Sequence, residues 1–97
     1  ERVRMTAVVV QTDSVGFIGR DGKYDIIFLD PPYDTDLLEK SLERIVKFDI
    51  LNDGGIIICE SRLEKPIPAL TAPYFVEKER TYGKIKITVC GKRNEAE

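Results

Sequence analysis

Three short runs of apolar, mostly β-branched residues place the strongest constraint on the fold of this 97-residue chain. They cover residues 7–10, 26–29 and 56–59, and polar residues follow each run at once. Uninterrupted apolarity over four residues indicates strands that are buried on both faces, as in a parallel sheet. Because a helical pattern separates the second run from the third, the sequence predicts an open α/β sheet.

The helix is expected to begin at Asp36, which can cap it, with Glu39 completing a pair that resembles a capping box. Four apolar residues then share one helical face, namely Leu38, Leu42, Ile45 and Val46. The pattern ends near Phe48, and residues 51–55 are predicted to form a turn into the third strand.

Three prolines between residues 66 and 73 predict a loop after the third strand. Two further strands are expected at residues 74–80 and 84–90, joined around Tyr82-Gly83. In the last strand, apolar residues alternate with Lys84, Lys86 and Thr88, which suits a half-exposed antiparallel hairpin.

The composition, with 42% hydrophobic and 33% charged residues, is typical of a soluble globular protein. No apolar run approaches the roughly 18 residues of a membrane span, and we see no secretion signal, so a cytoplasmic location is expected. Cys59 and Cys90 lie within apolar runs and are expected to be reduced, buried thiols. Because the chain has no histidine, no metal site is expected.

The net charge of −2 is unlike that of most nucleic-acid-binding proteins, which usually carry a basic stripe. The charge is uneven, however. Residues 78–93 carry six basic residues, Lys78, Arg80, Lys84, Lys86, Lys92 and Arg93, and one acid, Glu79. This segment is interpreted either as a local basic face or as an ordinary solvated strand.

The motif Asp30-Pro31-Pro32-Tyr33 directly follows the second apolar run. Ligands of open α/β sheets bind beyond the carboxyl ends of the strands, so this is the place of a binding site. An ionised Asp30 is purely a hydrogen-bond acceptor, and Pro31 keeps it out of helical geometry. Neither proline has a backbone N–H to donate, and Tyr33 adds a flat aromatic face.

Rigid acceptors beside an aromatic ring suit a planar ligand that presents an amino group, such as adenine, guanine or cytosine. Stacking of a base on an aromatic side chain contributes about 1–3 kcal/mol. Two acceptors on the amine hydrogens favour a localised nitrogen lone pair, and alignment with an electrophilic methyl group would supply much of the acceleration. A polar turn that merely ends a buried strand would account for the same residues.

The motif and its surroundings resemble the RsmD-type bacterial methyltransferases, whose relatives carry [D/N/S]-P-P-[Y/F/W]. The likeness extends to residues 8–14, 24–33 and 37–39, to Leu51-x-x-Gly54-Gly55-x-Ile57-x-x-x-Glu60 and to Tyr82-Gly83. The resemblance implies the C-terminal half of a Rossmann-like sheet, mostly parallel with a terminal antiparallel hairpin. It also implies S-adenosyl-L-methionine as cofactor and N2 of a guanine in 16S ribosomal RNA, within the small ribosomal subunit, as the methyl acceptor.

The resemblance assigns catalysis and target-base binding to four motif residues, Asp30, Pro31, Pro32 and Tyr33. It assigns cofactor contacts to Asp13, Ser14 and Asp30. It assigns RNA contacts to Tyr33, Glu60, Tyr82 and Gly83. Asp13 also suits a helix N-cap, Glu60 a solvated acid and Tyr82-Gly83 a plain hairpin turn.

The sequence departs from the family in one large respect. The glycine-rich cofactor loop and the acidic residue that ends the family's second strand do not occur in it, and Gly54-Gly55 precedes a strand and cannot replace that loop. In the family's sheet, two strands lie between those formed here by residues 7–10 and 24–29. We therefore expect a single partial methyltransferase domain over residues 1–97, a first strand without a neighbour, and an inactive chain when it is alone.

The sequence is also compatible with other functions. N6-adenine DNA methylation uses the same chemistry, and a non-catalytic binding module would suit the pI of about 5.2 and the missing loop. A protein-glutamine methyltransferase fits less well, because that relative typically carries Asn where this chain has Asp30. No membrane partner is expected, whereas unpaired strand edges favour a dimer as an alternative state of the chain.

Overall fold

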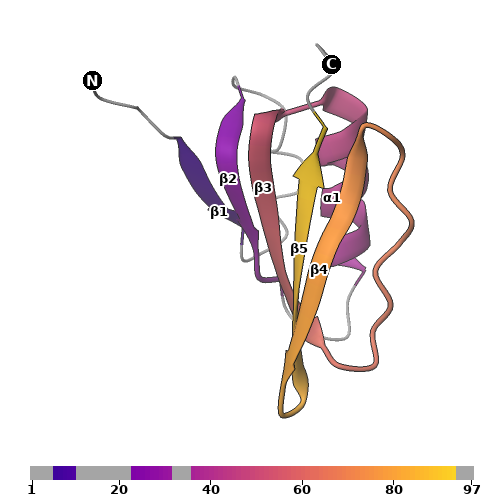
Figure 1. Cartoon of the computed structure of the whole chain (residues 1–97). Helices are drawn as coiled ribbons and strands as arrows, with labels where there is room; N and C mark the ends of the chain where they lie inside the picture. The colour runs from indigo at the N-terminus through magenta and orange to yellow at the C-terminus, as the bar shows by residue number, and fades with distance from the viewer. Residues whose placement is uncertain (1–5, 11–22, 32–35, 94–97) are drawn as a thin grey trace.

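The computed structural model describes residues 6–10, 23–31 and 36–93, which form the strands and the helix of Figure 1. In chain order the elements are β1 (Ala7–Val10), β2 (Tyr24–Leu29), α1 (Leu37–Phe48), β3 (Leu51–Arg62), β4 (Tyr74–Tyr82) and β5 (Ile85–Lys92). Within these ranges, the structure contains no helix that is long and apolar enough to cross a membrane.

The strands form one sheet in the order β1-β2-β3-β5-β4 (Figure 1). Neighbouring strands are parallel from β1 to β3, whereas β5 is antiparallel to both β3 and β4. The predicted α/β class and the terminal antiparallel hairpin are therefore confirmed. The sheet is mixed, with as many antiparallel as parallel pairings, so "mostly parallel" describes it only loosely.

The expectation that the first strand has no neighbour is wrong in this structure. β1 pairs directly with β2, with Ala7 opposite Ile26 and Val10 opposite Leu29. An uncovered strand edge leaves backbone N–H and C=O groups without partners, and a short β-branched segment that pairs with the edge satisfies them. As a result, β1, β2 and β3 all direct their carboxyl ends toward the same edge of the sheet.

The core lies between α1 and one face of the sheet. Fully buried apolar residues of β2 and β3 pack with the apolar side of the helix, and the cluster includes Ile27, Leu29, Ile57, Leu42 and Ile45. Burial of one such side chain contributes about 1.5–3 kcal/mol. Both free thiols, Cys59 and Cys90, are buried in the same layer, as predicted.

The helix begins and ends where the sequence predicted, but its first turn is stabilised differently. Asp36 is the N-cap residue, yet its side chain makes no capping hydrogen bond, and it forms an ion pair with Lys40 at 3.2 Å. Glu39 forms an ion pair with Lys65 at 3.2 Å instead of closing a capping box. The capping-box prediction is therefore wrong, because tertiary and i,i+4 partners compete for both carboxylates.

The predicted turn at residues 51–55 is part of β3. Leu51 already pairs with Tyr24, and an irregularity in the β2–β3 register lies between Tyr24 and Ile26. Gly54 has φ +79°, a backbone conformation that glycine adopts without steric cost. The extra residues are thus absorbed in a bulge rather than in a turn that delays the strand.

In β5 the polar residues lie on the buried face and the apolar residues on the more exposed one. This is the opposite of what the alternation of apolar and polar residues usually indicates. Thr88 is fully buried and Lys86 is nearly so, on the side that faces α1 and residues 63–73. Their polar atoms have partners, because Lys86 Nζ donates to the carbonyl oxygen of Lys65 and Thr88 Oγ1 donates to Glu79 Oε2 at 3.4 Å. The apolar residues Ile85, Ile87 and Val89 lie on the other, half-exposed face.

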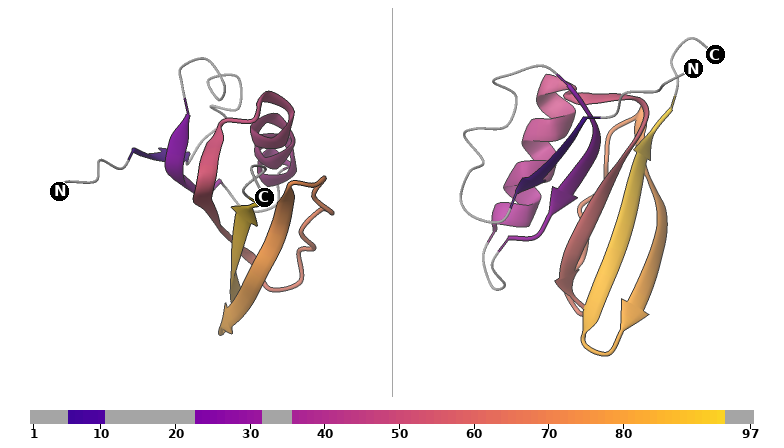
Figure 2. Two further views of the ribbon diagram at one scale, coloured as in Figure 1. Left: turned by 45° about the horizontal axis from the view of Figure 1, so that its top comes forward. Right: turned by 90° about the vertical axis from the view of Figure 1, so that its left-hand side faces the viewer.

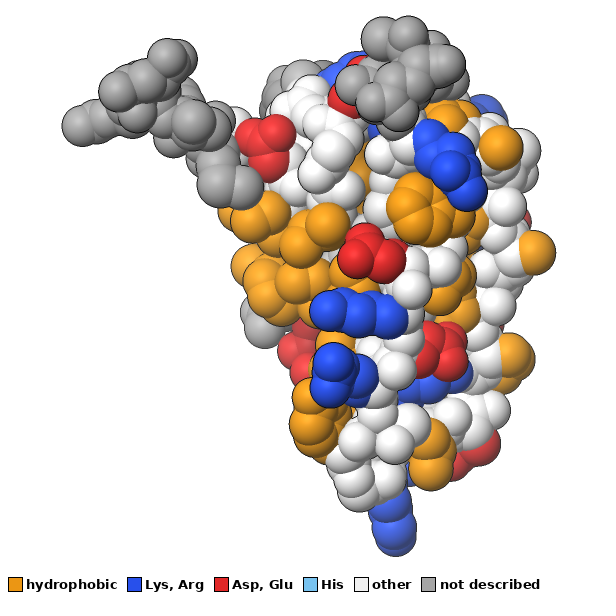
Figure 3. Space-filling model, viewed as in Figure 1, with side chains coloured by type: hydrophobic (Ala, Val, Ile, Leu, Met, Phe, Trp, Pro, Cys, Tyr) orange, Lys and Arg blue, Asp and Glu red, His pale blue; other side chains and the backbone are white. Residues whose placement is uncertain are grey.

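That other face of the sheet, called the open face below, has no covering layer within the described part of the chain (Figure 2). Val9 is 57% exposed and Phe28 is 43% exposed there. The inference that the apolar strands are buried on both faces is therefore wrong for this structure. Figure 3, which views the open face, shows hydrophobic side chains over β1 and β2 and basic side chains next to them.

Candidate functional site

The two acidic residues that follow the apolar runs of β2 and β3 lie side by side. Leu29 is opposite Cys59 in the parallel register, so Asp30 and Glu60 stand at the same level on adjacent strands, which are spaced about 4.8 Å apart. Both side chains are partly buried. The structure thus places two carboxylates next to each other at the carboxyl edge of the parallel strands.

Asp30 and Glu60 line a hollow of about 310 Å³ on the open face. Its remaining lining residues are apolar and come from four strands, namely Val9, Phe28, Leu29, Ile58 and Ile87. This volume lies at the lower end of the range for small-molecule sites. An apolar floor with acceptors at one side is suited to a flat ligand that carries hydrogen-bond donors on one edge.

Pro31 continues the chain directly from Asp30 and is buried. A buried proline limits the movement of the residue before it, because its ring fixes φ and restricts the preceding backbone to extended conformations. Pro32 and Tyr33 lie outside the described residues, as do Asp13 and Ser14. Their assignments as base-contacting and cofactor-contacting residues therefore stay predictions.

Tyr82 ends β4, and Gly83 begins the two-residue turn at the tip of the β4–β5 hairpin. Gly83 has φ +61° and Tyr82 is 61% exposed. Tyr82 is opposite Ile85, on the same face of the sheet as Ile87, which lines the hollow. The tip is therefore a true hairpin turn, as the simpler interpretation held, and its tyrosine also faces the side on which Asp30 lies.

The described residues are better suited to bind the amino group of a target base than to bind the cofactor. Two adjacent carboxylates can accept hydrogen bonds from an amino group, and the apolar floor can contact a ring. Among the described residues, no glycine and no residue of α1 lines the hollow, so this part of the chain does not supply a nucleotide cradle of the usual kind. It likewise contains no group of three or more residues suited to hold a metal ion.

The apolar floor of the hollow was missed by sequence reasoning. Phe28 and Ile58 lie inside uninterrupted apolar runs, where the two-residue period that would separate the faces of a strand is hidden. The alternation in β5 did contain the signal for Ile87, but it did not indicate which face was covered.

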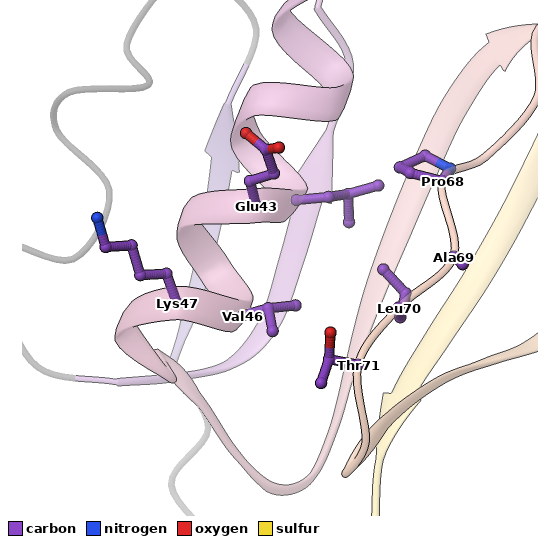
Figure 4. Close-up of a pocket in the computed structure, with 8 residues that line it drawn as sticks. Glu43, Val46, Lys47, Pro68, Ala69, Leu70 and Thr71 are labelled. Carbon is purple, nitrogen blue, oxygen red and sulfur yellow. The ribbon is translucent and has the colours of Figure 1, made fainter.

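A second hollow, also about 310 Å³, lies on the opposite side of the sheet, between α1 and the proline-rich segment of residues 63–73 (Figure 4). Val46 of the helix and Leu70 of the segment point toward the space between them, whereas Lys47 points away (Figure 4). Because no polar groups converge there, we regard this hollow as a packing gap rather than as part of the site.

A charged cluster at the amino edge of β3 has a structural role. The side chain of Lys92 is 3% exposed and contacts Asp49 at 2.8 Å and Asp53 at 3.3 Å, and its Nζ donates to the Leu51 carbonyl at 3.1 Å. Tyr74 donates to Asp49 at 2.8 Å. The hydrogen bond from Lys92, with smaller contributions from Tyr74 and Lys23, lowers the pKa of Asp49 to about 2 despite some burial.

The carboxylates also act on their two partners. Burial opposes the charge of Lys92, but Asp49 and Asp53 outweigh it and raise the pKa of Lys92. Burial, together with the charge of Asp49, raises the pKa of Tyr74 well above its usual range. Because Asp49 is the left-handed residue that ends α1, the cluster fixes the end of the helix to the sheet.

Comparison with known proteins gives a consistent result. The family model described as "Conserved hypothetical protein 95" matches residues 2–91. The chain is 29% identical over 80 residues to "Ribosomal RNA small subunit methyltransferase D" of Escherichia coli (strain K12), which covers 81% of this chain and 40% of that protein. The relative of the same name in Buchnera aphidicola is 31% identical over 81 residues, covering 79% of this chain and 40% of that protein.

Solved structures agree with the fold. "Putative methyltransferase yhhF from Escherichia coli" superposes with a TM-score of 0.71 at 25% identity, over 82% of this chain and 45% of that chain. The chain spans about 40% of the length of the curated relatives that it matches.

Proposed function

The chain belongs to the family described as "Conserved hypothetical protein 95", and from that premise we propose that the protein is an S-adenosylmethionine-dependent methyltransferase of small-subunit ribosomal RNA. We propose N2 of a guanine in 16S ribosomal RNA as the acceptor. The relatives' names support rRNA as the substrate, and the resemblance of the Asp30-Pro31-Pro32-Tyr33 motif supports an exocyclic amine as the acceptor group.

The observation that carries the proposal is the position of Asp30. It follows a core strand at the carboxyl edge of the parallel strands, beside Glu60, and lines a hollow with an apolar floor. Because Asp30 and Glu60 both line this hollow, two acceptors are placed to meet an amino group of a ligand that occupies it. The buried Pro31 restricts the backbone of Asp30, so that the acceptor is held in place before a ligand arrives.

The proposed chemistry depends on hydrogen-bond acceptance rather than on a strong base. Asp30 and the carbonyl oxygen of Pro31 would accept the two hydrogens of the amino group, which localises the nitrogen lone pair away from the ring. An amine held in this way would be poised for methylation at nitrogen, and its surplus proton would pass to water. S-adenosylmethionine, when bound, supplies the electrophilic methyl group. Tyr33 would support the ring from one side by stacking.

The test uses the complete gene product that contains this chain. With labelled S-adenosylmethionine and undermethylated small ribosomal subunits, we expect label in 16S rRNA. Asp30→Ala should reduce turnover by about 100-fold or more, because alignment of the amine is lost. Cofactor affinity, measured by calorimetry, should stay within about threefold, since Asp30 is proposed to act chiefly on the amine.

A matched control is Glu43→Ala, an exposed acid on α1 at the opposite side of the sheet, which should leave turnover unchanged. Retained turnover in Asp30→Ala would remove Asp30 from the chemistry. Label that enters only DNA would reject the ribosomal substrate and favour the N6-adenine alternative.

A further inference from the structure

The register of the hairpin determines which side chains of β4 reach the open face. Directly opposed residues of an antiparallel pair point to the same side of a sheet. Lys78 is opposite Val89, Arg80 is opposite Ile87 and Tyr82 is opposite Ile85. Since Ile87 lines the hollow with Asp30, all three β4 side chains lie on the open face.

A bulge produces this arrangement. The register between β4 and β5 shifts between Val76 and Lys78, so Lys78 rather than Glu77 is opposite Val89. Glu77, the extra residue of the bulge, lies beside Gly91 on the same open face, with its carboxylate oxygen 3.6 Å from the position that a Cβ of Gly91 would take. Lys78, Arg80 and Tyr82 thus present two cations and an aromatic ring to the open face, with the Glu77 carboxylate at one end of the group.

The four basic residues of this segment that belong to β4 and β5 are divided between two surroundings. Lys86 and Lys92 are buried on the covered side and contact carboxylates. Lys78 and Arg80 are exposed, and neither forms an ion pair within the described residues. Lys78 and Arg80 are therefore available to an external anion, whereas Lys86 and Lys92 already have carboxylate partners.

Arg80 lies on the same row of the sheet as two residues of the candidate site. Asp30, Glu60, Ile87 and Arg80 lie in one row across β2, β3, β5 and β4. Three strand spacings of about 4.8 Å place Arg80 roughly 14 Å from Asp30. Figure 3 shows both basic and acidic side chains beside the hydrophobic ones on this face. A chain of a few nucleotides can extend over this distance.

We propose that Lys78, Arg80 and Tyr82 form a contact surface for single-stranded RNA that flanks the target base. Lys78 and Arg80 contact phosphates, and Tyr82 stacks against a base. Single-stranded RNA is commonly bound in this way, by cations along the backbone and aromatic rings against the bases. The inference rests on the proposed function and adds to it a surface that positions the RNA.

The charge test compares two double variants of the complete gene product with equal net charge. Lys78→Glu/Arg80→Glu changes the open face, and Lys40→Glu/Lys47→Glu changes exposed cations of α1 on the other side of the sheet. Binding of protein-free, undermethylated 16S rRNA is measured at several salt concentrations, and methyl transfer is measured as kcat and KM. Urea unfolding midpoints verify that all variants fold.

We expect the open-face variant to bind RNA about tenfold more weakly or worse, with KM raised and kcat within about threefold. Each lost phosphate contact should reduce the slope of log K against log salt by about 0.7–0.9, or about 1.5 for two contacts. The α1 variant should match the wild type. Tyr82→Ala should weaken binding about fivefold or more, and Tyr82→Phe should restore it, because stacking needs the ring and not the hydroxyl.

Several outcomes would overturn the inference. RNA affinity and salt slope equal to those of the α1 variant would show that the surface does not contact phosphates. Normal binding of protein-free RNA together with impaired methylation of assembled subunits would indicate a ribosomal protein as the partner. If the wild type methylates no ribosomal RNA, the proposed function fails, and the binding comparison still decides whether this surface contacts RNA.

Discussion

Replacement of Lys92 by methionine should destabilise the chain, because Lys92 joins the end of the sheet to the end of α1. The side chain is 3% exposed and contacts Asp49, Asp53 and the Leu51 carbonyl oxygen. Methionine keeps an unbranched, apolar side chain in the same space and removes the charge and the donors.

The size of this loss of stability depends on how exposed Asp49 and Asp53 are. Removal of one member of a fully buried ion pair costs about 3–5 kcal/mol, because the remaining charge is left without water. Here the side chains of Asp49 and Asp53 are 47% and 50% exposed, so they regain hydration once Lys92 is lost. We therefore expect a loss of about 2 kcal/mol in the free energy of unfolding, from the buried hydrogen bonds of the ammonium group.

Urea unfolding at pH 7 measures this loss. With a slope of about 1–3 kcal/mol per molar urea, the midpoint should fall by about 1 M while the slope stays constant. In the background of Asp49→Asn, the same replacement should cost less, and the difference is the coupling between the two residues. Lys40→Met, which breaks only the exposed pair with Asp36, should change stability by less than about 0.5 kcal/mol. An unchanged midpoint for Lys92→Met would refute the structural role of the cluster.

Two further predictions concern stability. The pKa of Asp49 is lowered to about 2, below the ordinary value near 3.9, so its contribution is present above about pH 4 and is lost as the pH falls toward 2. Because the carboxylate is about half exposed, we expect this loss to be about 1 kcal/mol, measured as the difference in urea midpoint between wild type and Asp49→Asn at pH 5 and pH 2. Gly55→Ala should destabilise by about 2 kcal/mol or more, because its Cβ would lie 2.8 Å from the Asp25 carbonyl oxygen. Gly91→Ala should cost less, because its nearest neighbour is the ring tip of Phe75 at 3.1 Å, and equal thermal midpoints for the two variants would contradict this reasoning.

Much of the fold could be predicted from local patterns in the sequence. The apolar runs around Ile27 and Ile57 indicated strands, and the helical spacing of Leu38, Leu42 and Ile45 indicated the helix and its buried side. These patterns are local because side-chain direction repeats every two residues in a strand and every 3.6 in a helix. The place of Asp30 at the end of a core strand followed from the same information.

Other features could not be predicted because they depend on what covers each surface. Lys86 and Thr88 looked like the solvent face of a strand, but α1 and residues 63–73 cover that side and supply partners for their polar atoms. Asp36 and Glu39 have the spacing of a capping box, but their carboxylates form ion pairs with Lys40 and Lys65 instead.

The sequence by itself determined the identity of the elements, the acceptor motif at the end of β2 and the resemblance to a methyltransferase family. Only the tertiary structure decided that Asp30 stands beside Glu60, which sheet face is open, and that Lys78 and Arg80 lie on that face. The physical reason is that strand register and the covering of a sheet arise from contacts between residues that are distant in the chain, and a one-residue shift in register exchanges the two faces.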